Sequence, residues 1–339
     1  MAIPLRIIRV RPSATTLGGV DLLSDQLARA RAKGAVFSTL RRVAPWGLGF
    51  SGQRPLTAHI LLDGEGWVVD DAHPPLALRA GDVLLATAGA PYRVTSHPDA
   101  DAVPIADARH QGSDDRPGPA ARILCGAYVV DGSVGTMLLG SLPRYVHVPA
   151  DRQDSQHRAA IALLGAEAGK DGREGRHDTD GVGRQALLDR LLDLNLVYAL
   201  RTWWQQDRQH APGWYRALAH PGLKRVIEAV HQDPGGEWSL ERMAGTAAMS
   251  RAAFAAAFKE VVGEPPARYL RALRMALAED ALLRTDATLG AIAADVGYRN
   301  EFAFATAFRR DHGVAPGRWR SAYARTSAML PGAGDEDGL

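Results

Sequence analysis

The chain has 339 residues, 46% of them hydrophobic and 23% charged, and a formal net charge of only +2. That length suffices for two domains, the composition is that of an ordinary globular protein, and the balanced charge does not by itself indicate nucleic acid. Cys125 is the single cysteine, which excludes an internal disulfide, and the sequence offers neither a signal peptide nor an apolar run of the ~20 residues that cross a bilayer. We therefore expect a cytoplasmic protein with no membrane partner.

Residues 5–149 have the pattern of a domain built from short strands. Apolar runs of a few residues alternate with turn-forming spacers such as Asp63-Gly64. Strands of this length and spacing favour a small barrel or sandwich. Residues 22–31 differ, because their leucines recur at helical spacing, and we expect a helix packed on the barrel. Residues 99–121 are rich in Asp, Pro and Gly, which favours a mobile loop.

A helical connector is expected at residues 150–217. Within it, residues 169–183 form a charged, glycine-rich insert that favours disorder, and residues 185–204 follow as a helix. That helix has a wide apolar stripe, which serves either packing within the chain or a homodimer contact: Leu187, Leu188, Leu191, Leu192, Leu194 and Tyr198. The tail, residues 326–339, has the composition of a disordered segment.

Residues 221–325 are expected to be all helical and to begin with a helix-turn-helix unit. Ser239 is a good cap for a short helix with one apolar face, and Ala248-Met249 makes the turn. Ser250 then caps a second helix whose inward face carries phenylalanines. Small residues in the first helix allow the two helices to cross closely, as the motif requires.

The same arrangement recurs about fifty residues later. Gly297-Tyr298 makes the second turn, and Asn300 caps the second helix of that unit. The inward-facing residues recur at identical spacing, Phe254 and Phe258 in the first unit and Phe304 and Phe308 in the second. A helix over residues 266–283 connects the units and spans roughly 27 Å at 1.5 Å per residue. That length suits two helices in successive major-groove segments about 34 Å apart.

Residues 238–320 resemble the C-terminal domain of AraC/XylS-type transcription regulators. The phrases that carry this resemblance are Leu240-Glu241-Arg242-Met243-Ala244, Met249-Ser250-Arg251, Phe258-Lys259, Gly263-Glu264-Pro265-Pro266, Tyr269-Leu270, Arg274-Met275, Ile292-Ala293, Val296-Gly297-Tyr298, Phe308-Arg309-Arg310 and Gly313-Val314-Ala315-Pro316. The resemblance covers about a quarter of the chain and implies double-stranded DNA as the partner.

Residues 221–325 hold 15 Lys or Arg and 12 Asp or Glu, so phosphate contact depends on the placement of a few cations rather than on bulk charge. The best candidates lie at the ends of the motifs: Arg251, Lys259, Arg299, Arg309, Arg310 and Arg318. The alternative for each of them is a solvated surface charge without a role in DNA binding. Beside the caps Ser250 and Asn300, the resemblance implies base reading by Ala252, Ala255 and Ala256 in the first unit and by Glu301, Phe302, Ala305 and Thr306 in the second. Many relatives carry an Arg where Ala256 stands, and alanines offer only apolar contact. We therefore expect the second unit to supply most hydrogen-bonded discrimination.

Residues 21–149 resemble the cupin-like ligand-binding domain that one AraC subfamily fuses to this DNA-binding domain. The matching phrases are Ala44-Pro45-Trp46-Gly47, residues 59–64, residues 78–84 and Leu124-Cys125-Gly126. Enzymatic cupins hold a metal through a His-x-His pair, a carboxylate and a later His, whereas here His59 has no such partner, so we expect no metal and no cofactor. The residues that line either a small-molecule effector pocket or plain barrel core are Trp46, His59, Trp67 and Tyr92.

The sequence thus predicts an α+β chain: a degenerate cupin-like β-barrel, a helical connector and an all-α double helix-turn-helix domain. It predicts a ligand-responsive transcription regulator without catalytic residues. Three alternatives stay open: a cupin oxygenase or isomerase with a DNA-binding tail, an alkyl-acceptor repair protein, and a constitutive DNA-binding protein whose barrel only dimerises. Cys125 is either an inert buried thiol or a redox sensor, and its surroundings lack the His and the motif that alkyl transfer needs. The effector, the operator and the direction of regulation are not determined, and an activator would also contact RNA polymerase.

Overall fold

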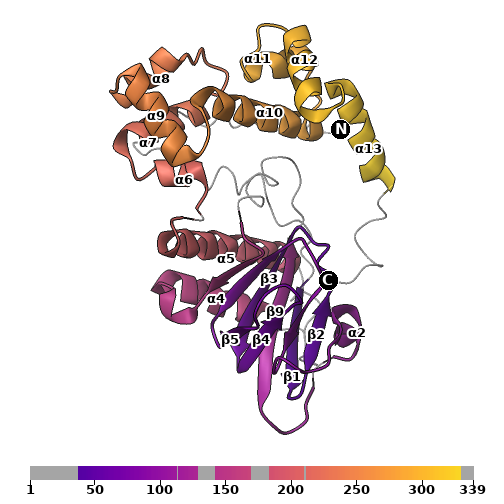
Figure 1. Cartoon of the computed structure of the whole chain (residues 1–339). Coiled ribbons are helices and arrows are strands. Elements are labelled where there is room, and N and C mark those ends of the chain that lie inside the picture. Colours follow the sequence, from indigo (N-terminus) through magenta and orange to yellow (C-terminus); the bar gives the residue numbers. More distant parts are fainter. Residues whose placement is uncertain (1–36, 113, 129–141, 169–182, 210, 330–339) are drawn as a thin grey trace, which may run out of the picture.

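The computed structural model describes residues 37–112, 114–128, 142–168, 183–209 and 211–329, and Figure 1 shows a sheet-containing half and a helical half. In the first half, the described strands form two five-stranded sheets: sheet A, of order β1-β9-β3-β6-β10, and sheet B, of order β5-β4-β7-β2-β8. The strands of sheet A are β1 Phe37–Val43, β9 Ala120–Tyr128, β3 Leu56–Asp63, β6 Val83–Thr87 and β10 Tyr145–Val148. Those of sheet B are β5 Leu76–Arg79, β4 Glu65–Val69, β7 Tyr92–Thr95, β2 Gly47–Phe50 and β8 Val103–Pro104.

Sheet A is the middle of three layers and is buried on both faces. Successive side chains of β3 point in opposite directions, so Ala58 and Ile60 pack on the helices α4 (Ser155–Ala168) and α5 (Arg184–Gln206), whereas Leu61 packs against sheet B. Figure 1 shows the two helices lying on the sheet. The two covered faces explain why consecutive side chains of β3, from Leu56 to Leu61, are all buried, including the polar Thr57 and His59.

Two expectations for this half need correction. The sheets face each other across a shared apolar core but do not close into a barrel, because the strands at their edges pair on one side only. Residues 99–121 are not one mobile loop: they contain β8, helix α2 (Ile105–His110) and the start of β9. Two apolar side chains, Ile105 at 1% and Ala108 at 0% exposure, suffice to hold this short helix against the core. The Arg42 guanidinium also donates to the Gly112 carbonyl at 2.6 Å.

The connector helix predicted at residues 185–204 is confirmed as α5. Its apolar stripe divides in two. Leu188 and Leu192 are buried, whereas Leu187 is 47% exposed and Leu194 is 39% exposed. The predicted helix at residues 22–31 lies outside the described residues, as does nearly all of the insert at residues 169–183.

The helical half runs from α6 to α13 and has two cores, one at each end of α10. Its helices are α6 Gly213–Ala217, α7 Pro221–Gln232, α8 Leu240–Ala247, α9 Arg251–Val262, α10 Pro266–Arg284, α11 Leu289–Asp295, α12 Glu301–His312 and α13 Pro316–Met329. The core of α7, α8 and α9 includes Phe254 and Phe258 and is continuous with the residues that α4 and α5 bury on sheet A. The core of α11 and α12 is separate and is centred on Phe304 and Phe308.

Helix α10 contributes to both cores. Its first half packs on the core of α7, α8 and α9, and its second half packs on the core of α11 and α12. Tyr269 and Leu273 belong to the first core, and Met275 and Leu282 belong to the second. Its 19 residues span about 28 Å. Helix α13 ends at Met329, and residues 330–339 lie outside the described part. No helix of the described segments is both long and apolar enough to cross a membrane.

Candidate nucleic-acid interface

Both second helices begin with the cap that the sequence predicts. Ser250 Oγ accepts a hydrogen bond from the Ala253 N–H at 3.2 Å at the start of α9. Asn300 Oδ1 accepts one from the Ala303 N–H at 2.9 Å at the start of α12. Ser239 caps α8 in the same way. Because each cap oxygen already accepts from its own helix, Ser250 and Asn300 serve first to orient α9 and α12.

The turns of the two units differ by one residue. A residue in the left-handed region follows the first helix of each unit, Ala248 with φ of 56° directly after α8 and Gly297 with φ of 75° two residues after the end of α11. The next N–H closes each helix by donating to a carbonyl five residues back, at 2.9 Å from Met249 and 2.8 Å from Tyr298. One residue then separates Ala248 from its cap, whereas two separate Gly297 from Asn300. The extra residue of the second unit is Arg299, which is exposed.

The exposed face of α9 is small and almost uncharged near its start. Ala252 and Ala256 are exposed, and Ala255 is half-buried beside the buried Phe254. Charge comes to this face from Arg251 at the first position and, two turns later, from Lys259 and Glu260, which are all exposed. A surface of methyl groups allows a close approach of the helix backbone but offers no hydrogen bond to a base edge.

Helix α12 presents a larger and more varied face. Glu301 and Thr306 are exposed and can accept or donate hydrogen bonds, while Ala305 is half-buried. Phe302 is 76% exposed, although the two other phenylalanines of this helix are fully buried. A phenylalanine so exposed in the first turn of the helix has no packing role within the described chain.

The cations expected near phosphate are exposed, and most are free of intramolecular partners. Within the described ranges, no carboxylate pairs with Arg251, Lys259, Arg299 or Arg309. Arg310 differs, because its Nε lies 3.5 Å from Asp311 Oδ1. Arg318, in the first turn of α13, is also exposed. Cations without a carboxylate partner are available to an external anion such as a phosphate.

Three other arginines have a structural role that the sequence does not indicate. Arg274 of α10 donates from Nε to the Pro234 carbonyl at 2.7 Å and from Nη2 to the Gly236 carbonyl at 2.8 Å. Arg225 donates to the Thr246 and Ala247 carbonyls at the end of α8, and Arg320 donates to the Leu282 and Ala287 carbonyls before α11. Each of these arginines binds carbonyl groups at a loop or a helix end. The sequence does not predict this role, because the partners come together only in the tertiary structure.

The expected effector residues His59 and Tyr92 are packed between the sheets. His59 Nε2 lies 2.7 Å from Tyr92 Oη, and His59 Nδ1 lies 3.3 Å from Cys125 Sγ. Phe50 stacks on Tyr92 with ring centroids 5.0 Å apart. Burial lowers the pKa of His59 to about 3 and raises the pKa of Cys125 to about 12, so both groups are neutral at pH 7. This arrangement fits a hydrogen-bonded core, and a thiol this hard to ionise is a poor nucleophile.

The other two expected effector residues lie apart from that pair. Trp46 is 6% exposed and lies on a polar surface hollow near Arg42 and Asp114, while Trp67 is half-buried on β4. A pocket of about 580 Å³ lies elsewhere, beneath α4 on the outer face of sheet A. Across the described residues, no three His, Cys, Asp or Glu side chains cluster so as to hold a metal.

Family comparison matches both halves of the chain. A family model described as Cupin matches residues 21–205, which is more than half of the chain, and a model described as Helix-turn-helix domain matches residues 243–322. The second match includes α9, α10, α11 and α12, and therefore all the exposed faces described above.

Individual relatives agree with these matches. An AraC-like transcription regulator of Streptomyces lividans is 29% identical over 306 residues, which cover 89% of this chain and 98% of that protein. The RCS-specific HTH-type transcriptional activator RclR of Escherichia coli (strain K12) is 35% identical over 138 residues, 41% of this chain and 48% of that protein. The structure of ToxT from Vibrio cholerae is 11% identical and covers 85% of this chain and 98% of its own, with a TM-score of 0.33.

Proposed function

Since the chain belongs to the AraC-type transcription regulators that carry an N-terminal cupin domain, we propose that its two helix-turn-helix units divide the work of DNA recognition unequally. Helix α12 is the main reader of bases, and α9 holds the protein on the backbone. The observation that carries this proposal is the contrast between the exposed alanines of α9 and the exposed Glu301, Phe302 and Thr306 of α12.

Base reading by α12 combines two kinds of contact. The Glu301 carboxylate can accept from a cytosine amino group, and Thr306 can donate to or accept from a base edge. Phe302 supplies the apolar surface that suits a thymine methyl group. At the positions that match Phe302 and Thr306, helix α9 offers only the methyl groups of Ala252 and Ala256. The position that matches Glu301 is Arg251, which we assign to a phosphate contact, so the sequence preference of α9 is the weaker of the two. The site residues proposed for DNA remain those of the two helices and their caps.

Phosphate contacts come from the unpaired cations at the ends of the motifs. Arg251 and Lys259 flank the face of α9, and Arg299 and Arg309 flank that of α12. Helix α10, whose 19 residues span about 28 Å, connects the two units, and this length is comparable with the ~34 Å between successive major-groove segments. We therefore expect α9 and α12 to enter successive segments of the groove.

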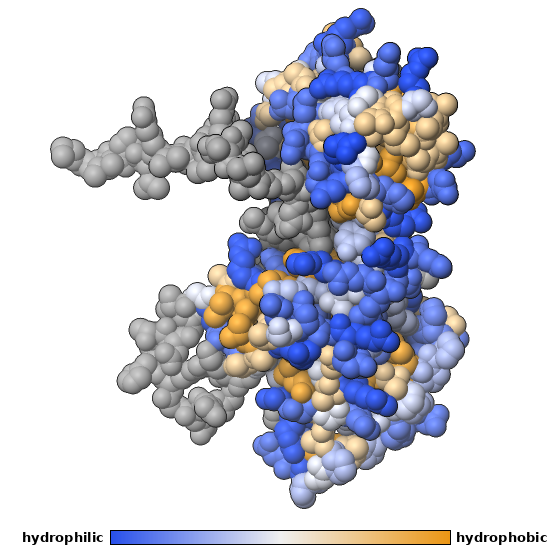
Figure 2. All heavy atoms as spheres, turned by 90° about the vertical axis from the view of Figure 1, so that its left-hand side faces the viewer, coloured by the Kyte–Doolittle hydropathy of each residue, from blue (hydrophilic) through white to orange (hydrophobic). Residues whose placement is uncertain are grey.

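The helical connector is a candidate dimer contact. Leu163 of α4 is 60% exposed, and Leu187 and Leu194 of α5 are also exposed. Figure 2 shows an apolar patch on the sheet-containing half, on the side where α4 lies in Figure 1. A second copy of the chain would cover these leucines, and sedimentation of a Leu187→Glu variant against the parent tests that contact.

Regulation is proposed to run through a small-molecule effector held by the sheet-containing half. We assign no catalytic activity to the chain and propose that it acts in the cytoplasm. RNA polymerase is a further partner only if the regulator activates transcription. Residues 5–149 are proposed as the regulatory domain, 150–217 as the connector and 221–325 as the DNA-binding domain.

Selection of bound fragments from the source genome tests the DNA-binding proposal. Purified full-length chain is incubated with sheared genomic DNA at about 0.15 M salt, near the physiological ionic strength, and the retained fragments are sequenced. We expect a shared motif whose better-defined half is protected by α12. Retention of fragments with no common motif, or of a motif equally sharp in both halves, contradicts the unequal division.

A further inference from the structure

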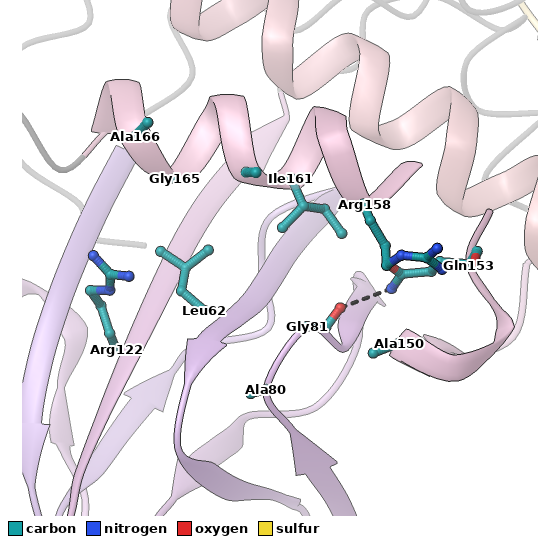
Figure 3. A pocket seen from close by; sticks show the side chains of 11 residues that line it. Leu62, Ala80, Gly81, Arg122, Ala150, Gln153, Arg158, Ile161, Gly165 and Ala166 are labelled. Atoms are coloured by element: carbon teal, nitrogen blue, oxygen red, sulfur yellow. Dashed lines mark hydrogen bonds between the residues drawn. The ribbon is translucent and has the colours of Figure 1, made fainter. Parts of the chain in front are cut away.

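A pocket lies between helix α4 and the outer face of sheet A (Figure 3), and it is open to solvent where Arg122, Arg158 and Ala162 are exposed. Its volume is about 580 Å³, within the range of roughly 300–1,000 Å³ typical of small-molecule sites. Most of its lining residues are glycine or alanine, which leave the space open: Ala80, Gly81, Ala150, Ala162, Gly165 and Ala166. At Gly165 the helix comes so close to the sheet that an added Cβ would lie 3.1 Å from a Leu62 methyl carbon.

The cavity has an apolar middle and an arginine toward each end. Figure 3 shows Leu62 and Ile161 between Arg122, which projects from sheet A, and Arg158, which projects from α4. Of the residues that the structure describes, none with a carboxylate side chain lines the cavity. The lining is therefore apolar and cationic, a combination that suits an organic anion with an apolar body.

The two ends differ in what they offer a ligand. Arg122 is already paired, since its Nη2 lies 2.7 Å from Asp63 Oδ2. Arg158 has no carboxylate partner among the described residues and donates one N–H to the Gln153 backbone carbonyl. The rest of its guanidinium remains available, so the anionic head of a ligand belongs at the Arg158 end.

Gln153 strengthens the polar character of that end. It is 5% exposed, and its side-chain Nε2 donates to the Gly81 carbonyl at 2.8 Å and to the Val148 carbonyl at 3.3 Å. Its Oε1 has no hydrogen-bond partner in the described part of the chain. Because this oxygen is an acceptor, it offers nothing to a carboxylate, and the Arg158 guanidinium alone supplies the donors at this end.

From these observations we propose that the cavity beneath α4 is a binding site for a monocarboxylate with an apolar body. The carboxylate pairs with Arg158 beside Gln153, and an aliphatic chain or an aromatic ring lies along Ile161 and Leu62. A free fatty acid and a small aromatic acid share this chemistry. The site is separate from the His59 and Tyr92 pair, which lies on the other face of sheet A.

Binding at this place can reach the first helix-turn-helix unit. Ile161, which lines the cavity, belongs to the same apolar core as Trp203 and Trp204 of α5 and as Phe254 of α9. The halves meet where the ring of Trp204 on α5 lies 5.8 Å from that of Trp214 on α6. Helix α6 in turn packs closely on α9, because a Cβ added at Gly213 would lie 2.0 Å from the Val262 carbonyl oxygen. The core of the second unit is separate. This regulatory consequence rests on the proposed function, whereas binding itself does not.

Calorimetric titration of the full-length chain tests the site with 4-phenylbutyrate and octanoate as probes and with 4-phenylbutan-1-ol and octan-1-ol as neutral counterparts. We expect at least one acid to bind at least tenfold more tightly than its alcohol. We expect Arg158→Met to lower the affinity for that acid at least tenfold. We expect Ala162→Phe, at an exposed position of α4, to abolish binding because the larger side chain fills the cavity. Arg122→Met is the matched control within the same cavity and changes the affinity less than threefold, because Asp63 already neutralises Arg122.

Several results overturn the site: no binding of either acid, equal binding of acid and alcohol, or acid binding that survives both Arg158→Met and Ala162→Phe with an unchanged circular dichroism spectrum. The regulatory role is read separately by footprinting on a selected DNA fragment with and without the acid. Altered protection confined to the half-site of α9 supports the role. Acid binding without any change in protection supports the binding site but contradicts its regulatory role. Absence of specific DNA binding by the ligand-free chain contradicts the proposed function alone.

Discussion

Arg274 and Gly297 lie against each other across the two helix-turn-helix units. A Cβ added at Gly297 would come within 2.6 Å of Arg274 Nη2 and within 2.5 Å of the Gly235 carbonyl oxygen. The same guanidinium donates to the Pro234 and Gly236 carbonyls in the loop before α8. One side chain of α10 thus holds the entry loop of the first unit against the turn of the second, which links the orientation of α11 and α12 to that of α8.

Gly297→Ala is expected to destabilise the helical half by about 2 kcal/mol or more, because the new methyl group meets backbone and guanidinium atoms in a left-handed conformation. Ala248→Gly is the matched control, since it removes a methyl group at the equivalent turn, where φ is 56°. Relief of left-handed strain offsets the greater freedom of unfolded glycine, so its effect stays within about 1 kcal/mol. Urea unfolding followed by far-UV circular dichroism measures both, and equal effects would contradict the difference between the turns.

Glu301→Ala and Phe302→Ala are expected to relax base preference in the half-site under α12. Each lost base contact costs about 1–3 kcal/mol on the preferred sequence and much less on others. Quantitative footprinting on the preferred site and on single-base variants measures this discrimination. Ala256→Ser, at an exposed position of α9, is the control and leaves the preference for the α12 half-site intact. An unchanged site preference in both α12 variants would contradict the assignment of α12 as the main base-recognition helix.

Removal of an unpaired cation is expected to weaken binding to all sequences alike. Arg299→Ala, Arg309→Ala and Lys259→Ala should each reduce the slope of log affinity against log salt by about 1, since each loses one phosphate contact. Arg310→Ala serves as the comparison, because Asp311 already lies 3.5 Å from its guanidinium, and it should reduce the slope less. Fluorescence anisotropy with labelled duplexes at several salt concentrations gives the slopes. A slope unaltered by all three variants argues against phosphate contact.

His157 makes the stability of the connector depend on pH. It is fully buried on α4, stacks on Tyr198 at 5.5 Å, and neither ring nitrogen has a hydrogen-bond partner in the described residues. Burial lowers its pKa from 6.5 to about 4, an effect that the charge of Asp154 opposes. Between these two values the unfolded chain binds a proton that the folded chain does not, so stability is lost as the pH falls from about 6.5 to about 4.

His157→Phe should remove that dependence, because the ring keeps its stacking but cannot titrate. The difference in unfolding free energy between the parent and the variant should change by up to roughly 3 kcal/mol between pH 7 and pH 4. Thermal unfolding at a series of pH values measures it, with His110→Phe, on the exposed end of α2, as control. A parallel decline of parent and His157→Phe over this window would show that other groups account for it.

Local sequence determined the DNA-binding half closely. The caps Ser239, Ser250 and Asn300 and the phenylalanine pairs lie where the sequence predicts them, because a cap and a helical face depend only on residues within a few positions of each other. A fourth cap, Thr288 on α11, went unpredicted although it has the same local signature. In residues 99–121 the low apolar content hid a short helix, since Ile105 and Ala108 are too few to give a periodic pattern.

Only the tertiary structure decided the features that join distant segments. The pairing of β3 with β9 and β6, the contact of His59 with Tyr92 and Cys125, the carbonyl clamps of Arg274 and Arg320, and the cavity at Arg158 each bring together residues far apart in the chain. The local sequence does not distinguish the arginines by role. Some bind the carbonyl groups of a loop, one lines a cavity, and others are available to bind a phosphate. Their roles differ because packing of helices and sheets over long sequence separations, which no local pattern encodes, determines what each guanidinium meets.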